Sequence, residues 1–142
     1  MRKAKKYYIL LGIVQIFIAI SAIPAGITFI IDPSGQLNGT TTGLLANSPF
    51  SNFLIPGLFL LIVHGVGNLF CALLSFQRLN IASIAGMLLG TTLLLWIIFQ
   101  VIWIGLISFL QPLFFVIGII EVILGFIIYS KLRKQNQQMR YH

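Results

Sequence analysis

The stretch FLIPGLFLLIVHGVGNLFCALLSF, residues 53–76, is long and apolar enough to form a membrane-spanning helix, and it decides the fold. About twenty apolar residues at about 1.5 Å each match a hydrocarbon core of roughly 30 Å. A helix satisfies its own backbone hydrogen bonds in that environment. At heptad spacing, one side of this helix carries mostly small and polar residues: Gly57, Leu61, His64, Asn68, Cys71 and Ser75. Because a polar residue is costly against lipid, this side is predicted to face protein.

The composition of the whole chain indicates an integral membrane protein. Of its 142 residues, 58% are hydrophobic and 8% are charged, and the mean hydropathy is +1.03. So few charges could not cover the surface of a soluble domain of this length. The connections between apolar segments are too short to hold a second core, so one domain covering residues 1–142 is predicted.

Three further apolar segments accompany the first, and together they predict an all-α fold, an integral membrane four-helix bundle. The predicted spans are residues 7–31, 54–76, 81–104 and 112–130. The first span follows a basic leader as in a signal peptide, but it is longer than the apolar region of such a peptide. Loop 32–53 is the only long connection, and residues 131–142 form a polar, basic tail.

Glycines at helical spacing predict where the spans touch one another. Residues 86–90 form a G-x-x-x-G pattern, which permits two helices to approach closely. The predicted packing glycines of the third and fourth spans are Gly86, Gly90, Gly118 and Gly125.

The positions of the basic residues predict the orientation of the bundle. All nine Lys and Arg lie in the leader, at Arg78 or in the tail. Since cytoplasmic loops are enriched in these residues, both termini are predicted to be cytoplasmic, and loop 32–53 and loop 105–111 to face outward. The basic ends would meet anionic lipid headgroups, so the net charge of +7 requires no nucleic-acid partner.

Glu121 and His64 are the candidate functional residues of the spans. Each stands about ten residues from the outward start of its span, which places both near the bilayer midplane. A buried carboxyl group is either protonated or partnered, and His64, Gln15 and Asn68 are the available partners, with Gln100 as further polar support. A structural pair that fixes helix register is favoured over a proton or cation relay.

Other site chemistry has little support in this chain. Cys71 is the single cysteine, so paired-thiol redox chemistry and a CxxC metal site are excluded. One membrane histidine cannot ligate a haem from both sides unless two chains share it. Metalloprotease, aspartyl-pair and serine-nucleophile motifs are missing. We therefore predict no metal, no cofactor and no enzymatic activity.

Three phrases carry a resemblance to a known family: DPSG at residues 32–35, SPFSNFLIPG at 48–57, and LQP at 110–112. The chain resembles a widespread family of small, uncharacterised four-span bacterial membrane proteins. In that family a D-P-x-G turn follows span 1 and an S-P-F-x-x-F-L-I-P-G phrase opens span 2. The resemblance covers most of the chain and implies a multi-pass protein of the bacterial cytoplasmic (inner) membrane. It brings no activity, substrate or catalytic residue.

Two classes of function remain open. The first is a non-enzymatic accessory or interaction component, whose loop 32–53 or basic ends contact a membrane-protein partner or a second copy of the chain. The alternative is a small oligomeric transporter or channel that uses the Glu121 and His64 pair as a relay. The number of polar residues favours the first class, because a transport pathway needs a continuous line of them.

Overall fold

A computed structural model gives the fold and describes residues 4–140. Arg2 and Lys3 of the basic leader and His142 of the tail lie outside the described residues. The described chain is helical and contains no strand, so the predicted all-α class is confirmed. Its helices are α1 (Lys5–Ile31), α2 (Leu54–Phe59), η4 (Leu60–Gly67), α3 (Asn68–Phe76), α4 (Ile81–Ile104) and α5 (Leu110–Arg140). Loop 32–53 holds two short 3₁₀ turns, η2 (Gln36–Asn38) and η3 (Thr42–Leu45).

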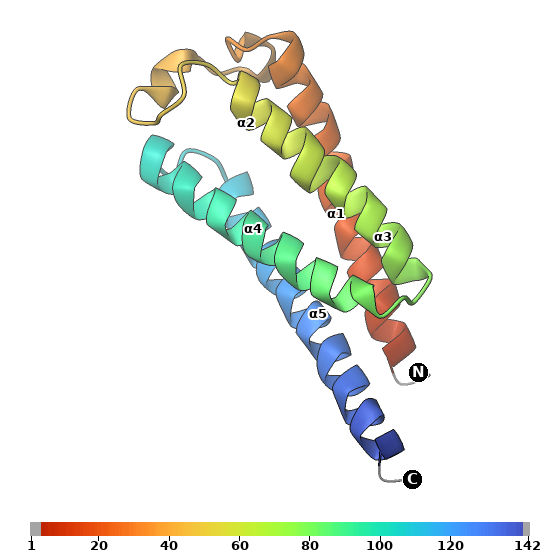
Figure 1. Cartoon of the computed structure of the whole chain (residues 1–142). Helices are drawn as coiled ribbons and strands as arrows, with labels where there is room; N and C mark the ends of the chain where they lie inside the picture. Colours follow the sequence, from red (N-terminus) through yellow and green to blue (C-terminus); the bar gives the residue numbers. More distant parts are fainter. Residues whose placement is uncertain (1–3, 141–142) are drawn as a thin grey trace.

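The helices form two antiparallel pairs (Figure 1). One pair consists of α1 and the continuous rod of α2, η4 and α3, and the other consists of α4 and α5, which make the most extensive contact of the bundle. Contacts between α1 and α5 join the two pairs. Both ends of the described chain lie at one end of the bundle and loop 32–53 at the other. We call these the termini end and the loop end.

Large apolar side chains cover the outside of the bundle, and its inside holds small and polar residues together with two apolar clusters, one around Leu11 and one around Ile18. Ile20 is 67% exposed, Leu88 64% and Ile102 67%. Soluble proteins do not expose apolar surface on this scale. All four predicted spans are helices long and apolar enough to cross a membrane. The fold therefore fits a small multi-pass membrane protein.

Glycines set the distance between helices within each pair. A β-carbon added at Gly90 of α4 would lie 2.9 Å from the Gly118 carbonyl oxygen of α5, and one at Gly125 would lie 2.7 Å from the Ser83 carbonyl oxygen. Backbone thus meets backbone along this contact, which only residues without a side chain permit. Gly86 lies instead against Leu11 of α1. The four packing glycines predicted from the sequence are all buried between helices.

The second span departs from the regular helix that its heptad pattern predicts. Residues 60–67, the element η4, form a π-helix, whose backbone hydrogen bonds link residues five apart instead of four. Within this segment His64 and Gly65 are buried. Gly65 lies against α1, where a β-carbon would be 2.7 Å from Ile23 Cγ1. Leu61, expected on the buried side, is only half-buried.

The turn between α3 and α4 ends α3 with a Schellman motif. The Leu79 N–H donates to the Leu74 carbonyl oxygen at 3.1 Å, and the Arg78 N–H donates to the Ser75 carbonyl oxygen at 3.0 Å. Arg78 occupies the left-handed position of this motif, with φ of 57°, where glycine is the usual residue. The basic residue that marks this turn in the sequence is therefore held in a strained backbone conformation.

Helix α5 is longer than its predicted span at both ends. It begins at Leu110 rather than Pro112, because proline is tolerated within the first turn of a helix. It also continues without a break through the basic tail to Arg140. The tail therefore projects from the termini end as a helix.

Candidate functional site

A cluster of buried polar side chains joins the helices in the interior of the bundle. Gln15, Asn68, Ser75 and Glu121 are all fully buried. The Ser75 hydroxyl of α3 donates to Gln15 Oε1 of α1 at 2.8 Å, and Asn68 Nδ2 donates to the His64 carbonyl oxygen at 3.0 Å. Polar contacts of this kind fix how helices sit against one another in an apolar interior. The bond between Gln15 and Ser75 therefore holds α1 against α3.

Glu121 approaches this cluster from α5. Its side chain faces Gln15, but neither carboxyl oxygen has a hydrogen-bond partner among the described residues, and neither does Gln15 Nε2. Gln15 Nε2 also lies close to α4, since a β-carbon at Gly86 would be 3.5 Å from it. Of the three partners that the sequence suggests for Glu121, Gln15 is the one that it faces.

His64 lies in the π-helical segment and is fully buried. Its ring meets the ring of Phe59 edge to face, with centroids 5.3 Å apart and planes at 74°. Phe59 in turn stacks on Trp96 of α4, with centroids 4.8 Å apart. Neither ring nitrogen of His64 has a hydrogen-bond partner among residues 4–140. The imidazole is therefore held by packing, including the Phe59 ring, and by no hydrogen bond among the described residues.

Glu121 and His64, the candidate pair of the sequence, are not hydrogen-bonded to each other. Helix α5 packs on α4 and α1, whereas η4 packs mainly on α1, so the two side chains face different neighbours. Glu121 faces the polar cluster, and His64 lines a pocket to which Glu121 does not contribute. The sequence leaves open whether the two side chains touch, because a similar depth in the bilayer does not fix the side of its helix on which each residue lies.

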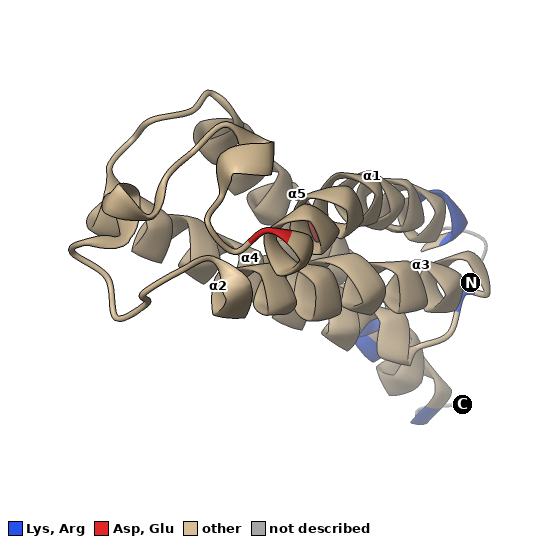
Figure 2. Cartoon of the chain, turned by 90° about the horizontal axis from the view of Figure 1, so that it is seen from above, with Lys and Arg blue, Asp and Glu red and all other residues tan. Residues whose placement is uncertain are grey.

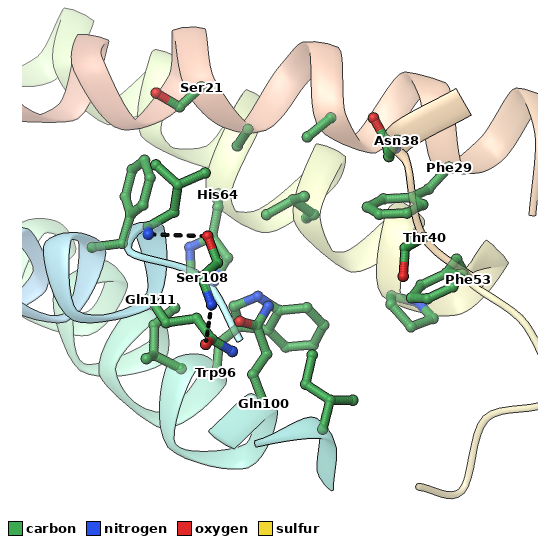
Figure 3. Close-up of a pocket in the computed structure, with 18 of the residues that line it drawn as sticks. Ser21, Phe29, Asn38, Thr40, Phe53, His64, Trp96, Gln100, Ser108 and Gln111 are labelled. Atoms are coloured by element: carbon green, nitrogen blue, oxygen red, sulfur yellow. Dashed lines mark hydrogen bonds between the residues drawn. The ribbon is translucent and has the colours of Figure 1, made fainter. Parts of the chain in front are cut away.

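The pocket lies between the two helix pairs at the loop end and has a volume of about 480 Å³ (Figure 3). Its wall is mostly apolar, with aromatic side chains from every part of the bundle: Phe17, Phe29, Phe50, Phe53, Trp96, Trp103 and Phe114. No Lys, Arg, Asp or Glu is among its lining residues. His64 and Gln100 supply polar groups to this wall, so Gln100 supports the pocket and does not belong to the Glu121 cluster.

Gln111 closes the wall of the pocket near the start of α5. Its Oε1 accepts hydrogen bonds from the N–H groups of Ile107 (2.9 Å) and Ser108 (3.3 Å), and its Nε2 donates to the Gly105 carbonyl oxygen at 3.2 Å. One side chain thus holds the whole turn between α4 and α5. The sequence predicts only a short loop at residues 105–111, because no local pattern there reveals these hydrogen bonds.

Loop 32–53 covers the same end of the pocket, and Asp32 orders its first turn. The Asp32 carboxylate accepts hydrogen bonds from the Ser34 hydroxyl at 2.5 Å and from the Leu37 N–H at 3.0 Å. These two bonds, with the Ser34 bond the larger cause, hold the pKa of Asp32 below its ordinary value. The Phe53 N–H donates to the Pro33 carbonyl oxygen at 2.9 Å and ties the loop back to the start of α2.

Acid is expected to loosen this turn. Because the folded pKa of Asp32 lies below the unfolded value of about 4, its contribution is complete above pH 4 and is lost as the pH falls through the folded pKa. Hydrogen exchange of the Leu37 amide, corrected for its intrinsic rate, should show protection that falls below pH 4. The Gly39 amide, which donates to the Gln36 carbonyl oxygen at 3.0 Å, is the control without a titrating acceptor. If Asp32→Asn keeps the same pH dependence at Leu37, the carboxylate is not its cause.

The basic residues of the described chain lie toward the termini end (Figure 2). Two of them, Lys6 of α1 and Lys131 of α5, lie over the ring of Tyr7, with Nζ atoms 5.1 Å and 5.4 Å from its centroid. This arrangement brings cations from the first and last spans to one aromatic ring. The basic residues thus lie at the end of the bundle that the sequence predicts to be cytoplasmic.

Within residues 4–140, no three His, Cys, Asp or Glu side chains come together as metal ligands would. Cys71 is buried in α3 as a free thiol. The chemical features on which function can be argued are thus the polar cluster around Gln15 and the pocket that contains His64.

Fold and site together define the class: a small helical protein with four spans, tight glycine contacts and an apolar pocket at its loop end. Comparison with protein-family models, with curated proteins and with solved structures gives no match. The family resemblance carried by the DPSG and SPFSNFLIPG phrases therefore stays a prediction.

Proposed function

We propose that this protein is a non-enzymatic, multi-pass component of the bacterial cytoplasmic membrane that holds an apolar ligand in its loop-end pocket. The observation that carries the proposal is the pocket itself, an apolar space of about 480 Å³ with His64 among its lining residues. Ligand sites are typically concave spaces of about 300–1,000 Å³ with apolar walls and a few placed polar groups.

The surroundings of the pocket support a ligand taken from the bilayer. The pocket is lined by α1 residues Phe17, Ser21 and Ala25 on one side and by the first turns of α5 on the other. Outside these residues the bundle presents apolar side chains, as a surface in contact with lipid does. With the orientation predicted from the basic residues, the pocket lies in the outer half of the membrane.

A binding role agrees better with the polar groups than a relay does. A relay requires proton or cation donors and acceptors in a continuous line. Glu121 faces Gln15 in the polar cluster, while His64 faces the pocket, and no hydrogen bond connects the two. We therefore assign Glu121 and Gln15 to holding the helices together and His64 to the pocket.

The accessory role extends to the two ends of the molecule. At the termini end, Lys6, Lys131 and the helical tail present cations suited to anionic headgroups of the inner leaflet. At the loop end, the ordered loop 32–53 offers a surface for a membrane-protein partner or for a second copy of the chain. The pocket lies directly beneath this loop, so ligand binding and partner contact are adjacent.

Native mass spectrometry of protein extracted from its own membrane into nanodiscs tests the proposal. The wild type is expected to retain an apolar adduct of defined mass. Ala25→Phe, which places a ring in the pocket, should lose the adduct, whereas Ala85→Phe, on a half-buried residue of α4 outside the pocket, should keep it. Melting temperatures of both variants verify that they are folded. A wild type without an adduct, or a folded Ala25→Phe protein that keeps it, would contradict the proposal.

A further inference from the structure

The exposed residues of the pocket lining all lie on one side of the bundle, where α1 faces the start of α5. They are Phe17 of α1, Asn38 of loop 32–53, Ile107 of the α4–α5 turn and Leu110 at the start of α5. Asn38 belongs to this side because its Nδ2 donates to Thr28 Oγ1 of α1 at 2.8 Å. The lining residues of α2, η4 and α4 are all buried or half-buried. We call the exposed edge of the pocket, formed by these four residues, its mouth.

Aromatic contacts close the opposite side of the pocket, between α2 and α4. Phe59 of α2 stacks on Trp96 of α4 with ring centroids 4.8 Å apart, and Phe50 of loop 32–53 packs edge to face on Trp103 at 5.6 Å. Within each helix pair, glycine contacts leave no space between the helices. A molecule therefore reaches the pocket through the mouth, and the apolar side chains around the mouth place it against the hydrocarbon of the bilayer.

The chemistry of the wall restricts what enters through this mouth. No Lys, Arg, Asp or Glu lines the pocket, so a charged group inside it would lose its hydration without gaining a counter-charge. Apolar cavities do not hold water, and an empty one forfeits the dispersion contacts of its wall. Beside a mouth that opens to the bilayer, the abundant apolar molecules are the hydrocarbon chains of lipids.

The extent of the pocket along the bundle suits such a chain. Its lining follows α1 from Phe17 to Phe29, which is about 18 Å at about 1.5 Å per residue. Lipid chains run roughly parallel to membrane-spanning helices, so a chain beside the mouth already has the direction that it needs. At the loop end of the mouth, Asn38 supplies a neutral, polar amide at the level where the ester groups of a phospholipid would lie.

We propose that the pocket holds an acyl chain of a phospholipid, which enters sideways between α1 and α5 while its headgroup stays outside the mouth near Asn38. This inference rests on the proposed function and names the ligand class of the same pocket. The lipid comes from the leaflet at the loop end, which the basic residues predict to be the outer one. A compact, free apolar molecule is the competing occupant.

Tryptophan fluorescence of the full chain in lipid vesicles tests the proposal, because both tryptophans of the protein line the pocket. Trp103→Phe leaves Trp96 as the only indole and keeps an aromatic ring at position 103. This protein is reconstituted into phosphatidylcholine vesicles with or without bromine on the acyl chains, since bromine quenches an indole that it touches. The fluorescence of Trp96 is expected to be quenched in the brominated vesicles.

Two phenylalanine substitutions on α1 separate entry through the mouth from contact with the surrounding lipid. Ala25→Phe places a ring in the pocket and should lose most of the quenching of Trp96. Ile20→Phe adds a ring on the lipid-facing side of the same helix, where Ile20 is 67% exposed, and should keep it. Melting temperatures verify the fold of each variant. Ser21→Phe, which also places a ring in the pocket, repeats the test if Ala25→Phe does not fold.

Each result has a distinct meaning. Loss of quenching in the folded pocket variant, with quenching retained in Ile20→Phe, supports a lipid chain in the pocket. Equal quenching with and without the added ring in the pocket would show that lipid reaches Trp96 by another route, and the inference is overturned. If Trp96 is not quenched although the native protein retains an apolar adduct of defined mass, the occupant is not a phospholipid chain, and the proposed function stands. Absence of both quenching and adduct contradicts both.

Discussion

Gly90→Ala is expected to lower the free energy of unfolding by about 2 kcal/mol, although only one methyl group is added. A β-carbon at this position would lie 2.7 Å from Val122 Cγ2, 2.9 Å from the Gly118 carbonyl oxygen and 3.0 Å from the Val122 nitrogen. Two of these three atoms belong to the backbone of α5, so a change of rotamer cannot make room. The two helices must move apart along the most extensive contact of the bundle.

Gly67→Ala is the matched control for this prediction. Gly67 also lies within a span, but a β-carbon there would meet only the Ile62 carbonyl oxygen at 3.4 Å and Leu89 Cδ2 at 3.6 Å, which are ordinary contacts. Alanine favours helix over glycine by about 1 kcal/mol, so Gly67→Ala should be neutral or stabilising. Denaturation of both variants in the same detergent measures the difference. Equal stability of the two would mean that α4 and α5 do not approach each other as closely as the structure has them.

The buried faces of the helices could be predicted from the sequence because, in a membrane protein, small and polar residues mark the buried face of a helix, whereas in a soluble protein large apolar residues do. Lipid accepts leucine, isoleucine and phenylalanine on any face, so the informative residues are the small and polar ones. Gly86 and Gly90 in the third span, and Gly118 and Gly125 in the fourth, are all buried as their spacing predicts.

The local structure of the second span could not be predicted in this way. A heptad reading assumes one helical period throughout, and the π-helix from Leu60 to Gly67 breaks it. The two glycines at positions 65 and 67 are the only hint, because glycine permits both the close contact with Ile23 and a local change of turn. His64 nevertheless lies on the buried side that the pattern predicts, and it is among the residues that line the pocket.

The pocket itself depends on contacts between distant parts of the chain, which residue spacing does not reveal. It is lined by residues of both helix pairs, of loop 32–53 and of the α4–α5 turn, which lie far apart in the sequence. Gln111 holds that turn, and Phe50 of the loop packs edge to face on Trp103, with centroids 5.6 Å apart. Only a three-dimensional arrangement places these residues around one space.

The claim on which every other part of the account depends is that the chain crosses a membrane four times. Cysteine labelling in intact cells tests it most directly, in a Cys71→Ala background that removes the buried native thiol. Single cysteines are placed at four exposed or half-exposed positions outside the apolar parts of the helices: Thr41, Gln77, Leu106 and Gln135. A membrane-impermeant maleimide reacts only with those on the outer side.

We expect cysteines at positions 41 and 106 to be labelled in intact cells, and those at 77 and 135 only after lysis, because the basic residues predict that side to be cytoplasmic. Labelling of 77 and 135 in place of 41 and 106 would reverse the orientation and keep the four crossings. If positions 41 and 106 prove to lie on opposite sides of the membrane, or if positions 77 and 135 do, the four-span bundle itself is contradicted.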